Sequence, residues 1–259
     1  MVINGFDLGG KRALVVGAGS PVGGAIALAL AEAGADLALT PCTADPAEWA
    51  AVEACAGAVT GLGRRAAVLA VDVTSDQDVH STVDQAATDL GGLDILVNSM
   101  DLAFAKPLVE TTAEEWAHTL TANLTAVFLT TKYAALHMLR GGKGKIINVT
   151  SQLGERGLPN ASAYCAAKGG VALLTKAAAL EWGQQGISVN GIGLGWIEGD
   201  PLAQGDDEDM RTRLTRYIPM QRVGRPDEVG PLAVYLSSEA SDYITGHTLY
   251  VDGGVLSRL

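Results

Sequence analysis

A short apolar run, a glycine-rich turn and a helix-forming stretch follow one another at the start of the sequence. Residues 13–16 are apolar, residues 17–24 read GAGSPVGG, and the alanine- and leucine-rich run after them stops at Gly34. A second apolar run follows at residues 36–39. This order predicts a strand–turn–helix–strand unit, whose turn and first helical N–H groups can bind a pyrophosphate. Such a unit is typical of α/β folds with a parallel sheet.

Strand-like and helix-like segments continue to alternate through the rest of the chain. Further strands are predicted at residues 67–71, 95–97, 145–149, 187–192 and 247–251. The alternation predicts a Rossmann-type three-layer α/β sandwich, in which helices cover both faces of a doubly wound, mostly parallel, seven-stranded sheet. A length of 259 residues suits one such unit. We therefore predict that residues 1–259 form a single domain.

The composition argues against several other classes of protein. Hydrophobic residues make up 48% and charged residues 18% of the chain, which indicates a globular rather than a disordered protein. A formal net charge of −11 gives no support for a nucleic-acid-binding surface. Neither a signal peptide nor a run of about 18 apolar residues is recognisable. Three widely separated cysteines, without metal-ligand spacing, favour a reducing cytoplasm: Cys42, Cys55 and Cys165.

Residues 145–168 combine an apolar run, a loop and a helix start with the side chains of an acid–base site. Tyr164 and Lys168 are four residues apart, which places them one turn apart on the same helical face. A phenol with a pKa of about 10 is a weak acid or base at neutral pH unless a neighbouring cation, here Lys168, stabilises the phenolate. Ser151 could then hold a substrate oxygen while Tyr164 exchanges a proton with it. The same tyrosine–lysine spacing also occurs on solvated helix faces.

Together with Asn123 upstream, these residues resemble the Asn-Ser-Tyr-Lys tetrad of the short-chain dehydrogenase/reductase family. The resemblance extends from the turn near Gly17 to the closing GHTLYVDGG at residues 246–254. It implies an enzyme that uses NAD(H) or NADP(H) to transfer a hydride between nicotinamide and a carbonyl or secondary-alcohol carbon. Within the family the chain looks most like 3-oxoacyl-thioester reductases and related alcohol dehydrogenases. Family members are mostly tetramers or dimers, so the resemblance implies a homo-oligomer. It also implies a small-molecule carbonyl or alcohol substrate.

The resemblance also implies a role for each of the four tetrad residues. Tyr164 would exchange the proton of the reacting oxygen, and Ser151 would hydrogen-bond that oxygen. Lys168 would lower the pKa of the phenol and bind the nicotinamide ribose. Asn123 would anchor a water that relays protons to the lysine. Alternatively, Asn123 could be a core amide that backbone groups satisfy.

The glycine turn matches the family pattern Thr-Gly-x-x-x-Gly-x-Gly only in part. Pro21 replaces the middle glycine; it suits a first helical position but cannot donate to a phosphate. The turn residues expected to contact the cofactor are Gly17, Gly19, Ser20, Val22 and Gly23.

Further cofactor contacts are expected from the ends of later strands. Asp72 and Val73 resemble a pair that contacts adenine, although Asp72 could instead cap the next helix. Asn98 remains of a family Asn-Asn-Ala-Gly motif, and Gly195 and Ile197 match the turn after the sixth strand.

The choice between NAD and NADP is left open by the residues after the second strand. Residues 40–43 read TPCT, without the acid that binds ribose hydroxyls or the base that binds a 2′-phosphate. Asp45 could reach back toward a ribose.

Three departures from the family pattern lie in the nucleotide-binding half. They are Pro21, the segment Ser99–Asp101, and Leu194 with Gly199. For Asp101, a hydrogen bond to a ribose and a purely solvated loop position are both open. The departures motivate an alternative function, a non-catalytic or regulatory binding protein with a weakened nucleotide site. We favour the enzyme because the four tetrad residues are all present.

Overall fold

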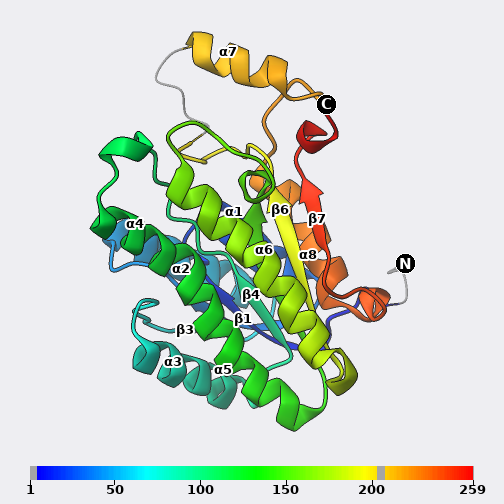
Figure 1. The fold of residues 1–259 in the computed structure, drawn as a ribbon. Helices are drawn as coiled ribbons and strands as arrows, with labels where there is room; N and C mark the ends of the chain where they lie inside the picture. Colours follow the sequence, from blue (N-terminus) through cyan, green and yellow to red (C-terminus); the bar gives the residue numbers. More distant parts are fainter. Residues whose placement is uncertain (1–4, 203–207, 259) are drawn as a thin grey trace.

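The computed structural model describes residues 5–202 and 208–258, and its strands form one parallel sheet (Figure 1). The sheet has seven strands in the order β3-β2-β1-β4-β5-β6-β7. Since the order reverses between β1 and β4, the sheet is doubly wound, as the sequence predicted. The strands are β1 (Arg12–Val16), β2 (Asp36–Thr40), β3 (Ala66–Val68), β4 (Ile95–Asn98), β5 (Gly144–Ser151), β6 (Ile187–Leu194) and β7 (Thr248–Val251).

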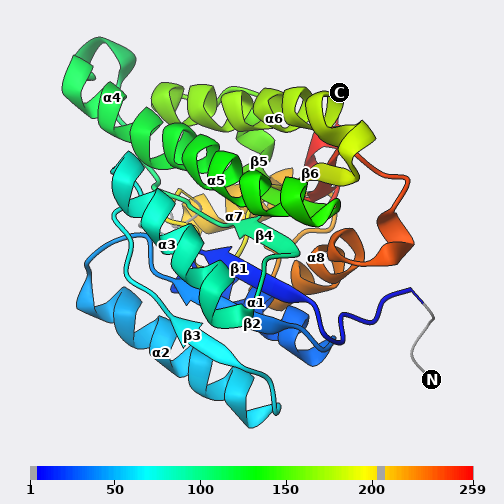
Figure 2. The ribbon, with the colours of Figure 1, turned by 90° about the horizontal axis from the view of Figure 1, so that it is seen from below.

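Helices cover both faces of the sheet, which gives the predicted three layers (Figure 2). One face packs against α3, α5 and α6, and the other against α1, α2 and α8. The helices are α1 (Pro21–Glu32), α2 (Pro46–Gly61), α3 (Asp76–Leu90), α4 (Ala113–Leu120), α5 (Ala126–Gly141), α6 (Ser162–Trp182), α7 (Glu208–Tyr217) and α8 (Gly230–Ser237). None of the helices in the described ranges is both long enough and apolar enough to cross a membrane.

Two strands of the sheet, β4 and β6, are buried along their whole length. All four residues of β4 and all eight of β6 are buried. Both strands are buried because helices cover both faces of the sheet; β4 reads as an apolar run up to Asn98, whereas β6 also buries Ser188 and Asn190. The carboxyl ends of these strands meet at one edge, where loops can bring together residues that are distant in the sequence.

The helical segment that contains Asn123 is interrupted at that residue. A π-helical turn, Thr121–Thr125, joins α4 to α5. Turns of this kind often occur at functional sites. The interruption therefore coincides with a tetrad residue.

Candidate active site

The turn between β1 and α1 is a backbone cradle that leaves no room for side chains. Gly17 has a φ of +88°, and a Cβ there would lie 2.6 Å from the carbonyl oxygen of Ser99. A Cβ at Gly23 would overlap the carbonyl oxygen of Gly17. Ser20 caps α1 by accepting a hydrogen bond of 3.0 Å from the N–H of Gly23, and Pro21 takes the predicted first helical position. A glycine turn that leads into a helix N-terminus fits the pyrophosphate of a dinucleotide.

Replacing Gly23 by alanine is expected to destabilise the fold by about 1–3 kcal/mol, because the added methyl group overpacks the turn. Saturable NADH binding should be lost with it. Gly57 provides the matched control, because it lies exposed in α2 and a Cβ added there would meet nothing within 4 Å. Gly57→Ala should stabilise by roughly 0.5–1 kcal/mol. Thermal unfolding and a fluorescence titration measure both effects; a Gly23→Ala protein that melts and binds like the wild type would contradict this account of the turn.

Two of the departures from the family pattern contact each other. Gly199 has a φ of +89°, and a Cβ there would lie 3.1 Å from Cγ of Pro21. Both residues line a cavity of about 210 Å³ at the carboxyl ends of the strands, and Leu194 lines it too. The proline ring therefore occupies space that the bare glycine leaves open.

This cavity brings together most of the residues predicted for the nicotinamide end. Ser151 and Tyr164 belong to its wall. Lys168 lies behind them, 1% exposed, with its Nζ atom 5.4 Å from the centroid of the Tyr164 ring. The predicted cofactor contacts that line the cavity are Ser20, Val22, Gly195 and Ile197.

A carboxylate that sequence reasoning did not place joins the tyrosine to the lysine. The Tyr164 hydroxyl donates a hydrogen bond of 2.6 Å to Oδ1 of Asp101. The Lys168 ammonium lies 3.0 Å from the same oxygen and donates a hydrogen bond of 2.9 Å to the carbonyl oxygen of Met100. Asp101 is thus neither an isolated loop residue nor remote from the tetrad. The signal in the sequence was an acid where the family motif has glycine.

The surroundings of the phenol oppose its ionisation. Burial, and then the charge and hydrogen bond of Asp101, raise the pKa of Tyr164 well above its ordinary value. The hydroxyl of Ser151 acts in the opposite direction. Burial and Asp101 outweigh any lowering of this pKa by Lys168, because Asp101 pairs with the ammonium group and accepts the hydrogen bond of the phenol, so the predicted role of Lys168 stays a prediction.

The two predicted asparagines use their amide groups inside the protein. Asn123 accepts a hydrogen bond of 2.9 Å from the N–H of Leu102 and donates to the carbonyl oxygens of Leu102 and Thr119. Backbone groups therefore satisfy its amide, as the alternative interpretation had it. Asn98 is fully buried and bonded to Asn148 of β5 and to two threonines of α5. Its side chain fixes the sheet to α5.

A second cavity of about 260 Å³ lies at the ends of β1, β2 and β4, and Gly19, Ser20 and Val73 line it. The side chain of Asp72 does not belong to that lining; its carboxylate accepts hydrogen bonds from the N–H and hydroxyl of Thr74. The cap of α3 is Ser75 rather than Asp72.

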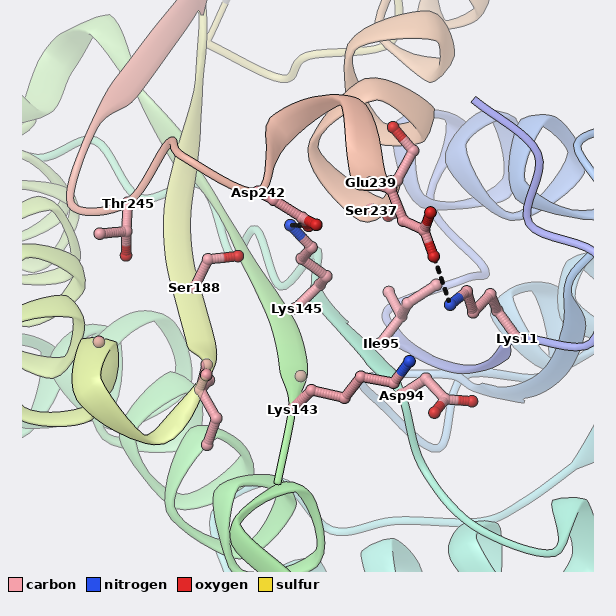
Figure 3. Close-up of a pocket in the computed structure, with 15 residues that line it drawn as sticks. Lys11, Asp94, Ile95, Lys143, Lys145, Ser188, Ser237, Glu239, Asp242 and Thr245 are labelled. Atoms are coloured by element: carbon pink, nitrogen blue, oxygen red, sulfur yellow. Dashed lines mark ion pairs between the residues drawn. The ribbon is translucent and has the colours of Figure 1, made fainter. Parts of the chain in front are cut away.

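A further cavity, of about 320 Å³, lies at the opposite end of the sheet, where β4, β5 and β6 begin (Figure 3). Two ion pairs line it. Lys11 lies 3.6 Å from Glu239, and Lys145 lies 2.8 Å from Asp242. The tetrad residues do not reach this end, so the candidate active site is the pair of cavities at the carboxyl ends.

Comparison with known proteins agrees with the fold and with these motifs. A family model described as enoyl-(acyl carrier protein) reductase matches residues 17–256. A 2-dehydro-3-deoxy-D-gluconate 5-dehydrogenase of Bacillus subtilis is 39% identical over 98% of this chain and 97% of its own length. A Burkholderia cenocepacia gluconate 5-dehydrogenase structure with NADP and tartrate is 34% identical, with a TM-score of 0.91 over 98% of both chains. A xylitol dehydrogenase structure with NAD⁺ is 30% identical, with a TM-score of 0.88 over 95% of this chain and 99% of the other. The sequence motifs, the fold and these matches together place the chain in the short-chain dehydrogenase/reductase family.

Proposed function

We propose that this NAD(P)-dependent oxidoreductase interconverts a secondary alcohol of a neutral polyol and the corresponding ketone. The single observation that carries the proposal is the shared cavity, in which Ser151 and Tyr164 face the same space as the residues after β6. Among the residues that the structure describes, the lining of this cavity includes three carboxylates and neither lysine nor arginine. The carboxylates are those of Asp101, Glu198 and Asp200. Carboxylates accept hydrogen bonds from the hydroxyl groups of a polyol. Glu198 adds a negative charge that would repel an anionic substrate, whereas Lys168 offsets the charge of Asp101.

The residues of the site would divide the chemistry among them. Bound nicotinamide supplies or accepts the hydride. Tyr164 gives a proton to the ketone oxygen in reduction and takes it from the alcohol in oxidation. Ser151 holds that oxygen by a hydrogen bond. Lys168 places a positive charge beside the phenol and binds the nicotinamide ribose. Asn123 keeps the backbone of the π turn in place for a relay water.

A substrate panel tests this proposal. We expect the purified protein to oxidise xylitol or threitol with a higher kcat/KM than gluconate, followed by nicotinamide absorbance. A preference for gluconate would contradict the neutral substrate and leave the oxidoreductase intact. No turnover of any alcohol or ketone, by a folded protein that binds a dinucleotide, would favour the alternative function as a non-catalytic binding protein.

We also propose that the chain is a homo-oligomer, a dimer or tetramer, formed through α5 and α6. These helices lie side by side in the same outer layer (Figures 1 and 2). They carry large apolar side chains that are exposed in the single chain: Phe128 by 46%, Leu173 by 66% and Leu180 by 87%. Apolar patches of this kind commonly mark protein–protein interfaces.

Placing a charge in this patch is expected to dissociate the oligomer, because the charge would be buried without a partner. Leu180→Glu should elute as a smaller species than the wild type in size-exclusion chromatography with light scattering. Leu62→Glu, at a 46% exposed position after α2 in the other layer, is the control and should leave the mass unchanged. A monomeric wild type at micromolar concentration would refute the proposal.

Two further proposals concern the chain as a whole. The seven strands share one sheet, which supports a single domain over residues 1–259. The three cysteines are free thiols, which supports a cytoplasmic location.

A further inference from the structure

The loop after β2 is closed by a carboxylate from the first turn of the next helix. Glu48 of α2 accepts hydrogen bonds from the N–H of Cys42, at 2.5 Å, and from the N–H of Thr43, at 3.0 Å. The Thr43 hydroxyl donates to it as well. Two successive backbone N–H groups and a hydroxyl, which together bind both oxygens of one carboxylate, form a site for an anion. In this protein its own carboxylate occupies that site.

The carboxylate of Glu48 also borders the dinucleotide cradle. A Cβ at Gly19 would overlap the Glu48 side chain, so the glycine turn and Glu48 are in direct contact. Both line the cavity of about 260 Å³, together with Ser20, Thr43, Val73 and Thr74. Glu48 contributes to a raised pKa of the Cys42 thiol, after burial, and Asp101 does so too. The carboxylates of Glu48 and Asp101 therefore both act on the Cys42 thiol, and all three residues line this cavity.

Asp45, the acid nearest to the end of β2, is not part of the described lining of this cavity. Its carboxylate caps α2 by accepting a hydrogen bond of 2.9 Å from the N–H of Ala47. The cavity beside Glu48 has neither lysine nor arginine in its described lining, and His118 is the basic residue found there. A 2′-phosphate would therefore meet a fixed negative charge and no strong cation.

We propose that Glu48 selects NAD(H) over NADP(H), as a specificity-determining residue that binds the adenosine ribose in place of an acid at the end of β2. The inference rests on the proposed dinucleotide-dependent function. A carboxylate has about four acceptor positions, and three are used by Cys42 and Thr43, so one remains for a ribose hydroxyl. A 2′-phosphate would have to displace the carboxylate from the same N–H groups. Loss of a hydrogen bond to a charged group predicts a preference of about 10- to 100-fold for NADH.

Binding measurements with whole and half cofactors test this inference. Calorimetry or fluorescence gives the Kd of NADH and NADPH. The same methods give the Kd of 5′-AMP and 2′,5′-ADP, the adenosine halves of the two cofactors, which lack the nicotinamide that would lie near Asp101. We expect the wild type to prefer NADH and 5′-AMP. Glu48→Gln, which removes the charge at nearly constant volume, should reduce each preference by about tenfold or more. Glu53→Gln on the exposed face of the same helix changes the net charge equally and should leave both ratios unchanged.

The outcomes separate this inference from the proposed function. A folded wild type that binds neither NADH nor NADPH contradicts both. Binding of both cofactors, with a preference for NADPH and 2′,5′-ADP, overturns the role of Glu48 and leaves the proposed function intact. So does a Glu48→Gln protein whose ratios equal those of Glu53→Gln. Should Glu48→Gln fail to fold, a wild type that binds 2′,5′-ADP more tightly than 5′-AMP would still overturn the role of Glu48.

Discussion

Tyr164→Phe is expected to lower kcat by about 10²- to 10⁴-fold, the usual contribution of a positioned acid or base. The substitution removes one oxygen atom from a side chain that is 4% exposed, so the ring continues to fill its place. Asp101 keeps its contact with Lys168, which limits the structural effect. Steady-state rates of reduction and oxidation, measured beside the Kd of NADH, distinguish lost chemistry from lost binding.

Tyr133 provides the matched control for this variant. It is also buried, 6% exposed, and its hydroxyl donates a hydrogen bond of 2.8 Å to Asp76, away from both cavities of the candidate site. Tyr133→Phe deletes the same atom and should retain turnover within a few-fold. Full activity of Tyr164→Phe would exclude the phenol as the proton donor.

Asp101→Asn is expected to shift the pH dependence of alcohol oxidation toward lower pH. The raised pKa of Tyr164 keeps the phenol protonated through the neutral range, and oxidation needs the phenolate. Removing the negative charge leaves Lys168 to stabilise the phenolate and so lowers the pKa. A larger share of the phenol is then ionised at neutral pH, so oxidation there should rise by about tenfold or more.

The pH profile of kcat/KM measures this effect, because it reports groups of the free enzyme. The groups that act on the phenol are Asp101, Lys168 and Asp200, together with the hydroxyl of Ser151. Asp200→Asn is the comparison, and should shift the profile in the same direction by less, because its charge ranks below that of Asp101 among the causes. Equal midpoints for Asp101→Asn and the wild type would show that Asp101 leaves the proton of the phenol unaffected.

Local patterns in the sequence were enough for the fold and for part of the site. Buried strands in a parallel sheet are often apolar runs, and helices start at caps and stop at glycines, so β1, α1 and β2 could be predicted nearly to the residue. Tyr164 and Lys168 belong to one helix, where a spacing of four residues sets their geometry. The glycines at 17 and 23 predicted a tight turn, which the structure contains.

The sequence by itself therefore determined the fold class, the order of the motifs and the family. Only the tertiary structure decided that Asp101 joins Tyr164 to Lys168, that Gly199 leaves room for Pro21, and that Glu48 closes the loop after β2. Asp101 and Tyr164 are 63 residues apart, so their contact depends on how β4 and α6 pack rather than on any local spacing. Periodicity sets the direction of a side chain along its own element. Packing between distant elements sets which charges meet, and here it places Asp101 where its charge raises the pKa of Tyr164.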